Sequence, residues 1–224
     1  VRMSFLTLTG TPIENSLSDL WSQVHFFNRN MLGSLPIFLS EVKKSTQQQL
    51  YRKLLHPFIL RRTKTDVLPD LPEKQITVQW CDMTEAQHKT YKDHRNFYRD
   101  KFLNNKDENG KVNAFVLLEG LLRLRQIANH PILVDKSYDE LSGKFELVIE
   151  MLSEITENGN KIIVFSSFVE HLKLLRETLD STGIVYAYLD GSTKDRKEQV
   201  EKFQHNPDVK IFLLSLKAGG TGLN

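Results

Sequence analysis

The chain has 224 residues, of which 40% are hydrophobic and 26% are charged, and its formal net charge is +2. This composition is typical of a globular protein with a sizeable core, and it excludes intrinsic disorder of the whole chain. A single cysteine excludes a disulfide-stabilised scaffold and favours a reducing, intracellular setting, and no apolar run is long enough to span a membrane.

The first sixty residues combine a short apolar run with helical patterns. Residues 5–9 predict a buried strand that ends in a turn. After the turn, apolar residues recur at helical spacing, and Ser16 and Asp19 are spaced as a capping box. Pro36 is placed to open a second helix, and a third helix is expected to end before Pro57.

A linker and a second helical section follow. Residues 58–64 form the linker, and residues 75–80 alternate as in a half-buried strand. Thr84 and Gln87 are spaced as another capping box, ahead of two helices of which the second stops at Pro131. This part of the chain has more basic than acidic residues. The excess positive charge could form a favourable face for a polyanion, or the Lys and Arg side chains could simply lie on the solvent-exposed sides of the helices.

Helical and strand patterns alternate over residues 142–224. Apolar runs at residues 162–165, 185–189 and 209–214 predict three buried strands, and the first of them is expected to be buried on both faces. Between these runs, apolar residues recur at helical spacing, which predicts helices. Short connections between alternating helices and strands predict an α/β unit with a parallel sheet and right-handed crossovers.

Three loops follow these strands, and parallel strands would place them at one edge of the sheet, where open α/β sheets bind ligands. The loops are residues 166–168, 190–192 and 215–224, and all are rich in small hydroxyl residues or glycine. In the last loop, Lys217 and its neighbouring glycines would let an ammonium group and backbone N–H groups approach a phosphate. The same glycines would equally suit a tight strand-to-helix turn that only permits close packing.

Other kinds of site find no support in the sequence. It contains neither the G-x-x-x-x-G-K-[ST] phosphate-binding loop nor the G-x-G-x-x-G dinucleotide fingerprint. Its seven histidines include no H-E-x-x-H motif and no cysteine partner, so no metal site is predicted. We therefore expect no complete nucleotide-hydrolysing site in this span.

A series of short motifs runs in order along nearly the whole chain. They are LTGTPIEN (8–15), FILRRTK (58–64), LPEK (71–74), LRQIANHP (124–131), SGK (142–144), IIVFSSF (162–168), LDGST (189–193) and SLKAGGTGLN (215–224). Each motif is weak by itself, but the collinear series is specific. It resembles the SWI/SNF-like branch of the superfamily-two helicase-related ATPases, with the first, sixth and last motifs similar to motifs III, IV and V of that family.

The resemblance implies two RecA-like lobes that clamp double-stranded DNA through its phosphates and bind ATP and Mg²⁺ between them. The expected fold is α/β, a RecA-like second motor lobe with a parallel sheet, together with helical protrusions and a piece of the first lobe. The implied parts are the end of lobe one (1–12), its helical protrusion (13–60), the interlobe linker with the first strand of lobe two (61–83), the helical protrusion of lobe two (84–135) and the RecA-like lobe two (136–224).

The resemblance also implies roles for individual residues. Thr9, Gly10 and Thr11 would couple the ATP state to DNA contact. Gly222 and Asn224 would approach the nucleotide cleft between the lobes. The residues that would contact the DNA backbone are Ser166, Ser215, Lys217, Gly219, Gly220 and Thr221. In the linker, Arg61, Arg62 and Lys64 would either add positive charge near DNA or form an ordinary interlobe salt bridge.

The remaining family motifs would lie outside this span. Motifs I and II, with the phosphate-binding loop and the Mg²⁺-holding acids, would precede it, and motif VI, with its arginine finger, would follow it. We therefore expect a fragment that is inactive alone, from an ATP hydrolase that translocates on DNA and displaces or remodels DNA-bound proteins, in a prokaryotic cytoplasm or a eukaryotic nucleus. The alternatives are a strand-separating helicase or RNA remodeler of the same superfamily, and a non-enzymatic DNA-binding scaffold.

Overall fold

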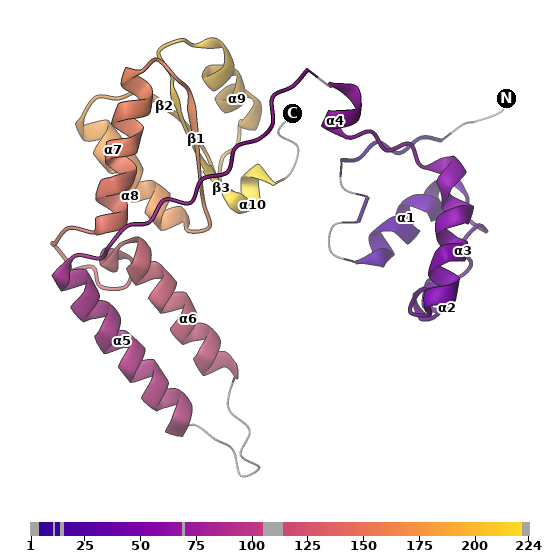
Figure 1. The fold of residues 1–224 in the computed structure, drawn as a ribbon, viewed down its shortest axis with the longest axis horizontal. Coiled ribbons are helices and arrows are strands. Elements are labelled where there is room, and N and C mark those ends of the chain that lie inside the picture. The colour runs from indigo at the N-terminus through magenta and orange to yellow at the C-terminus, as the bar shows by residue number, and fades with distance from the viewer. Residues whose placement is uncertain (1–4, 11, 14–15, 69, 105–113, 221–224) are drawn as a thin grey trace. The chain divides into compact units, whose positions relative to one another are not determined.

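The computed structural model describes residues 5–10, 12–13, 16–68, 70–104 and 114–220. The chain divides into two compact units, residues 1–76 and residues 77–224. This boundary lies within residues 61–83, which the sequence assigned to the interlobe linker and the first strand of lobe two, and it cuts the strand pattern predicted at residues 75–80. Among the described residues, the helices up to residue 67 belong to the first unit, whereas the helices from residue 85 onward and the strands belong to the second (Figure 1).

The first unit is helical. Its elements are α1 (Leu17–Phe27), α2 (Leu35–Val42), α3 (Ser45–Leu55), a 3₁₀ turn at His56–Phe58 and α4 (Lys64–Val67). The predicted capping box is confirmed at the start of α1, where the Ser16 N–H donates to Asp19 Oδ2 at 3.1 Å. Val24, Phe38 and Leu55 bury one side of α1, α2 and α3 in a common core.

The second unit joins a helical hairpin to a three-layered α/β part. Its elements are α5 (Glu85–Asn104), α6 (Ala114–Asn129), a 3₁₀ turn at Pro131–Leu133, α7 (Gly143–Glu157), β1 (Ile162–Ser166), α8 (Val169–Ser181), β2 (Tyr186–Leu189), α9 (Arg196–His205), β3 (Ile211–Ser215) and α10 (Leu216–Gly219). The strands form a parallel sheet in the order β1-β3-β2, so the predicted α/β unit is confirmed.

Helices cover the two faces of the sheet unequally (Figure 1). On one face, apolar side chains of α7 and α8, among them Leu152 and Leu175, pack against Leu213 of β3. On the other face, Val200 and Phe203 of α9 pack against the buried side chains of β2 and β3. Every residue of β3 is buried, because it is the central strand and has a helical layer on each side.

The expectation that the first strand is buried on both faces is wrong. On its second face, Ile163 is 48% exposed and Phe165 is 53% exposed. The reason is the strand order, since β1 lies at the edge of the sheet while α9 packs over β2 and β3. The apolar run identified the strand correctly but could not reveal which neighbours cover it.

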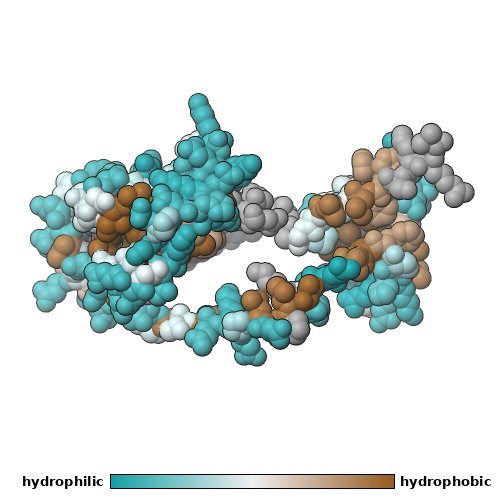
Figure 2. Space-filling view, turned by 90° about the horizontal axis from the view of Figure 1, so that it is seen from above, coloured by the Kyte–Doolittle hydropathy of each residue, from teal (hydrophilic) through white to brown (hydrophobic). Residues whose placement is uncertain are grey.

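Two other predicted strands do not form. In the run at residues 5–9, Leu6 is 78% exposed and Leu8 is 87% exposed, and in the run at residues 75–80, Val78 is 67% exposed and Trp80 is 86% exposed. A strand exists only where its backbone groups pair with a neighbouring strand, and neither run belongs to the sheet that the described residues form. Figure 2 shows apolar side chains at the surface.

Candidate nucleic-acid interface

The three predicted loops lie at one edge of the sheet. Parallel pairing sets Ser166 at the end of β1 opposite Ser215 at the end of β3, and it sets Leu189 of β2 opposite Leu214 of β3. The residues that follow these positions therefore emerge together at the carboxyl edge, as expected for an open α/β sheet. Had the strand directions been mixed, the loops would have been separated by the length of the sheet.

Ser166 and Ser215 are buried, and both hydroxyls are bonded within their own loops. The Ser166 hydroxyl donates to the Phe168 carbonyl and accepts from the Phe168 N–H, both at 3.1 Å. The Ser215 hydroxyl accepts from the Ala218 N–H at 3.3 Å and caps α10. These hydroxyls shape the turns at the edge of the sheet.

The glycine-rich turn after β3 combines an exposed cation with close packing. Lys217 lies on the exposed side of α10. A Cβ atom at Gly219 would lie 2.8 Å from Cε1 of Phe165, so any larger residue here would force the Phe165 ring to move. Gly220 is exposed at the end of the helix, whereas predicted site residues Thr221, Gly222 and Asn224 lie outside the described residues.

Arg196 at the start of α9 holds this turn and was not anticipated from the sequence. Its Nη2 donates to the Ala218 carbonyl at 3.0 Å. The bond connects the loop after β2 with the loop after β3, which are far apart in the sequence. The only sequence signal was a basic residue in the first turn of a predicted helix, where an acidic residue is the more favourable choice.

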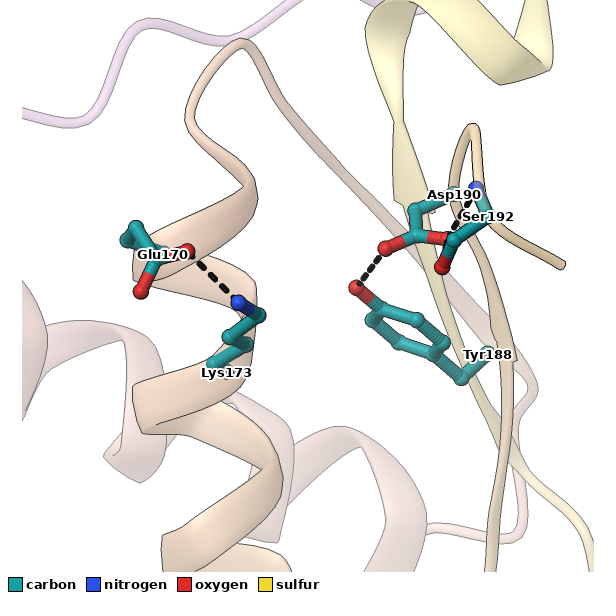
Figure 3. Close-up of polar contacts among 5 residues, drawn as sticks. All are labelled: Glu170, Lys173, Tyr188, Asp190 and Ser192. Atoms are coloured by element: carbon teal, nitrogen blue, oxygen red, sulfur yellow. Dashed lines mark hydrogen bonds and ion pairs between the residues drawn. The ribbon is translucent and has the colours of Figure 1, made fainter.

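Asp190 organises the loop after β2 (Figure 3). Its carboxylate accepts from the Ser192 N–H at 2.8 Å, from the Ser192 hydroxyl at 2.6 Å and from the Tyr188 hydroxyl at 2.7 Å. Burial alone would raise the pKa of Asp190, but these bonds and one from Thr193 outweigh it and lower the pKa to about 2. The carboxylate is thus ionised at neutral pH and holds the turn together through several hydrogen bonds.

Gln87 joins the helical hairpin to the α/β part, a role the sequence did not reveal. The side chain is fully buried, its Nε2 donates to the Ile127 carbonyl at 2.8 Å, and its Oε1 accepts from the Gly143 N–H at 3.2 Å. Its N–H donates to Thr84 Oγ1, so only that half of the predicted capping box forms. A Cβ at Gly143 would lie 1.9 Å from the Asp82 carbonyl oxygen, which explains the glycine of the SGK motif.

In the first unit, the predicted coupling residues and the predicted basic residues of the linker line the same cavity. Thr9 and Gly10 line a cavity of about 740 Å³ together with Arg61 and Arg62. Their closeness was not expected from the sequence, because some fifty positions separate them. Thr11 lies outside the described residues, and Lys64 begins α4.

Two further features, a metal-ligand cluster and a membrane-spanning helix, are absent from the described residues. No group of three or more His, Cys, Asp or Glu side chains among them could hold a metal ion. None of the helices in the described ranges is long and apolar enough to cross a membrane.

Comparisons with known proteins identify the same family at the level of sequence and of structure. The SNF2-related domain matches residues 3–133, and the helicase conserved C-terminal domain matches residues 143–224. An uncharacterized ATP-dependent helicase of Mycoplasma pneumoniae is 36% identical over 98% of this chain and 21% of its own length. The DNA repair and recombination protein RAD26 of Saccharomyces cerevisiae is 32% identical over 98% of this chain and 23% of its own.

Solved structures agree with this assignment. The Sulfolobus solfataricus SWI2/SNF2 ATPase core in complex with dsDNA is 34% identical, with a TM-score of 0.58, over 92% of this chain and 46% of its own. The chain thus spans about a fifth of the curated relatives and about half of that core. The expected RecA-like α/β class is confirmed, and, because a family model covers more than half of its length, the chain belongs to the SNF2-related family.

Proposed function

We propose that this chain is part of an ATP-dependent translocase on double-stranded DNA that displaces or remodels DNA-bound proteins. The observation that carries the proposal is the meeting of three loops at the carboxyl edge of the sheet, with Lys217 exposed beside them. The complex of the Sulfolobus core with dsDNA supports duplex DNA as the ligand. Contacts to phosphates carry no sequence information, so binding should be sequence-independent and strongly dependent on salt.

Within this proposal, the edge residues divide into two groups. Lys217, Gly220 and Thr221 contact the DNA backbone. Ser166, Ser215 and Gly219 are assigned to the same interface, where the buried serines and the half-buried glycine suit them to hold the loops in shape. Arg61, Arg62 and Lys64 add positive charge in the linker, and Thr9, Gly10 and Thr11 couple the nucleotide state to DNA contact.

ATP and Mg²⁺ belong to the proposed function of the full-length protein. The described residues lack an acidic cluster for a metal ion, so no step of ATP hydrolysis is assigned to them. Gly222 and Asn224 are proposed to approach the nucleotide from the second lobe. A chain without the phosphate-binding loop and the arginine finger should not hydrolyse ATP, since an arginine finger contributes roughly 10³–10⁵ to the rate of phosphoryl transfer.

The decisive experiment measures ATP hydrolysis by the full-length gene product with duplex DNA, single-stranded DNA or RNA. We expect duplex DNA to stimulate turnover most, and the protein to displace a triplex-forming strand without separating the duplex. Stimulation by single strands or RNA with strand separation would instead support a helicase or an RNA remodeler. Binding to DNA without any ATP hydrolysis would support a scaffold and contradict the proposal.

A further inference from the structure

A cavity of about 370 Å³ opens where α6, α7 and α8 meet, beside the end of β1. Its lining includes Arg125 of α6, Lys144 of α7 and His171 of α8, together with Ser166 and Ser167 of the loop after β1. None of its lining residues is an aspartate or a glutamate. The cavity therefore combines positive charge and hydrogen-bond donors with no carboxylate to neutralise them.

His171 contributes a buried nitrogen that has no partner. The residue is 6% exposed, and its Nε2 makes no hydrogen bond within the described part of the chain. Leaving a buried polar atom unbonded costs about 1–3 kcal/mol, so such atoms are rare in native proteins and call for an explanation, such as a bound water, ion or ligand. In the tautomer that is protonated at Nε2, this nitrogen donates to an oxygen placed in the cavity.

Arg125 and Lys144 are cations whose partners are uncharged. Lys144 Nζ donates to Asn129 Oδ1 at 3.2 Å, and the Arg125 guanidinium lies 5.3 Å from the ring centre of Phe168. No carboxylate of the described residues lies within 4.0 Å of either cation. These two positive charges are therefore held beside one cavity and are available to an anion.

The start of α8 adds to this electrostatic preference. Helix α8 has 13 residues and begins beside the cavity, and the first N–H groups of a helix carry a partial positive charge. Its first-turn carboxylate, Glu170, does not line the cavity and accepts from Lys173 at 2.6 Å (Figure 3). The nearby negative charge is thus already paired.

We propose that this cavity binds a phosphate group of the DNA backbone, with Arg125 and Lys144 as its cations and His171 Nε2 as a further donor. The inference rests on the proposed function, because it takes duplex DNA as the source of the phosphate. It adds Arg125 of α6, from the helical hairpin, and Lys144 of α7, from the α/β part, to an interface otherwise formed by loops of the sheet. The hairpin would then fix the path of the DNA backbone past β1.

Lysine footprinting of the full-length protein tests which anion enters the cavity. Amine acylation of Lys144 is followed by mass spectrometry with duplex DNA, with millimolar inorganic phosphate and with neither. We expect duplex DNA to slow acylation of Lys144 several-fold while Lys161, at the amino end of β1, reacts unchanged. Protection by inorganic phosphate alone would indicate a site for a free anion and overturn the assignment to DNA, as would no protection at all.

Variants of the full-length protein test the energetic contribution of the two cations. Each phosphate contact contributes about 0.9 to the slope of log K against log salt concentration. Lys144→Met and Arg125→Met should each reduce the magnitude of that slope by about one. Lys144→Arg keeps the charge and should keep the slope, and the matched control Lys161→Met, which removes one positive charge at the opposite edge of the sheet, should leave it unchanged.

The outcomes separate this inference from the proposed function. If the wild-type protein binds duplex DNA and both cation variants keep its slope, the phosphate site is overturned while the translocase proposal stands. If DNA binding is normal but ATP hydrolysis is absent, the translocase proposal fails, and the slopes still decide the phosphate site. A wild-type protein that does not bind DNA would overturn both.

Discussion

At the scale of single residues, His171 should connect stability to pH. Burial, with smaller contributions from the charges of Lys144 and His130, lowers the pKa of His171 from 6.5 to about 4. In the unfolded chain the pKa returns to about 6.5, so as the pH falls the unfolded state takes up the proton first. The contribution of His171 to stability is therefore complete above pH 6.5 and is lost towards pH 4, with a total of about 3 kcal/mol.

Urea unfolding of the chain between pH 7.5 and pH 4 measures this effect. The variant His171→Leu cannot take up the proton, so its free energy of unfolding should fall less over this range than that of the wild type. Asp190, whose pKa is lowered to about 2, loses its stabilising contribution only at lower pH, as the pH falls from about 4 towards 2. Equal losses in the wild type and in His171→Leu would show that the imidazole is not buried as described.

Residue-level function was only partly predictable from the sequence. Glycines and hydroxyls after each strand correctly indicated the edge where the loops meet. The sequence could not show that Ser166 and Ser215 would use their hydroxyls inside their own turns, because that depends on the backbone path after each strand. The sequence also could not show that Arg196 of α9 contacts Ala218 of α10, because strand β3 and the turn before it separate these two helices along the chain.

At the scale of secondary-structure elements, the hairpin of α5 and α6 should depend on Gln87. Replacing Gln87 with alanine leaves the buried Ile127 carbonyl without a partner, at a cost of about 1–3 kcal/mol, and it also removes the acceptor of the partly buried Gly143 N–H. We expect faster hydrogen exchange at the ends of α5, α6 and α7 that meet there, while exchange in β3 stays slow.

The control is Gln126→Ala on α6, which removes a partly buried contact at 3.4 Å between Gln126 Oε1 and Arg123 Nη1 of the same helix. Hydrogen exchange measured by mass spectrometry should distinguish the two variants by region. If Gln87→Ala and Gln126→Ala gave the same exchange pattern, the buried amide would not be the joint between the hairpin and the α/β part.

Elements were predictable wherever their signal was local. Helix α8 and strand β3 follow from apolar spacing and from a continuous apolar run, and both form as predicted. The runs at residues 5–9 and 75–80 carry equally clear strand patterns, yet neither forms a strand, because pairing depends on a partner elsewhere in the chain. Local pattern therefore identifies a possible strand, and topology decides whether it forms.

At the scale of the whole molecule, the chain should behave as two separable units. Between α4 and α5 the described residues contain no helix or strand, and Trp80 in this stretch is 86% exposed. Exposed segments without regular structure are the preferred sites of proteolysis. Brief treatment with chymotrypsin should therefore cut first after Trp80 and release a fragment that contains the hairpin, the sheet and its helices.

The other tryptophan of the chain, Trp21, is an internal control for this cleavage. Trp21 lies within α1, and its Nε1 donates to the Gly33 carbonyl at 3.1 Å, so cleavage after it requires unfolding of the helix. Trp80→Ala should delay the first cut without changing the fragments that resist digestion, as judged by intact-mass measurement over time. First cuts inside α7, α8 or the strands would contradict the division, because those elements share the core of the second unit. A cut between the units that becomes slower with duplex DNA would indicate that the ligand fixes their arrangement.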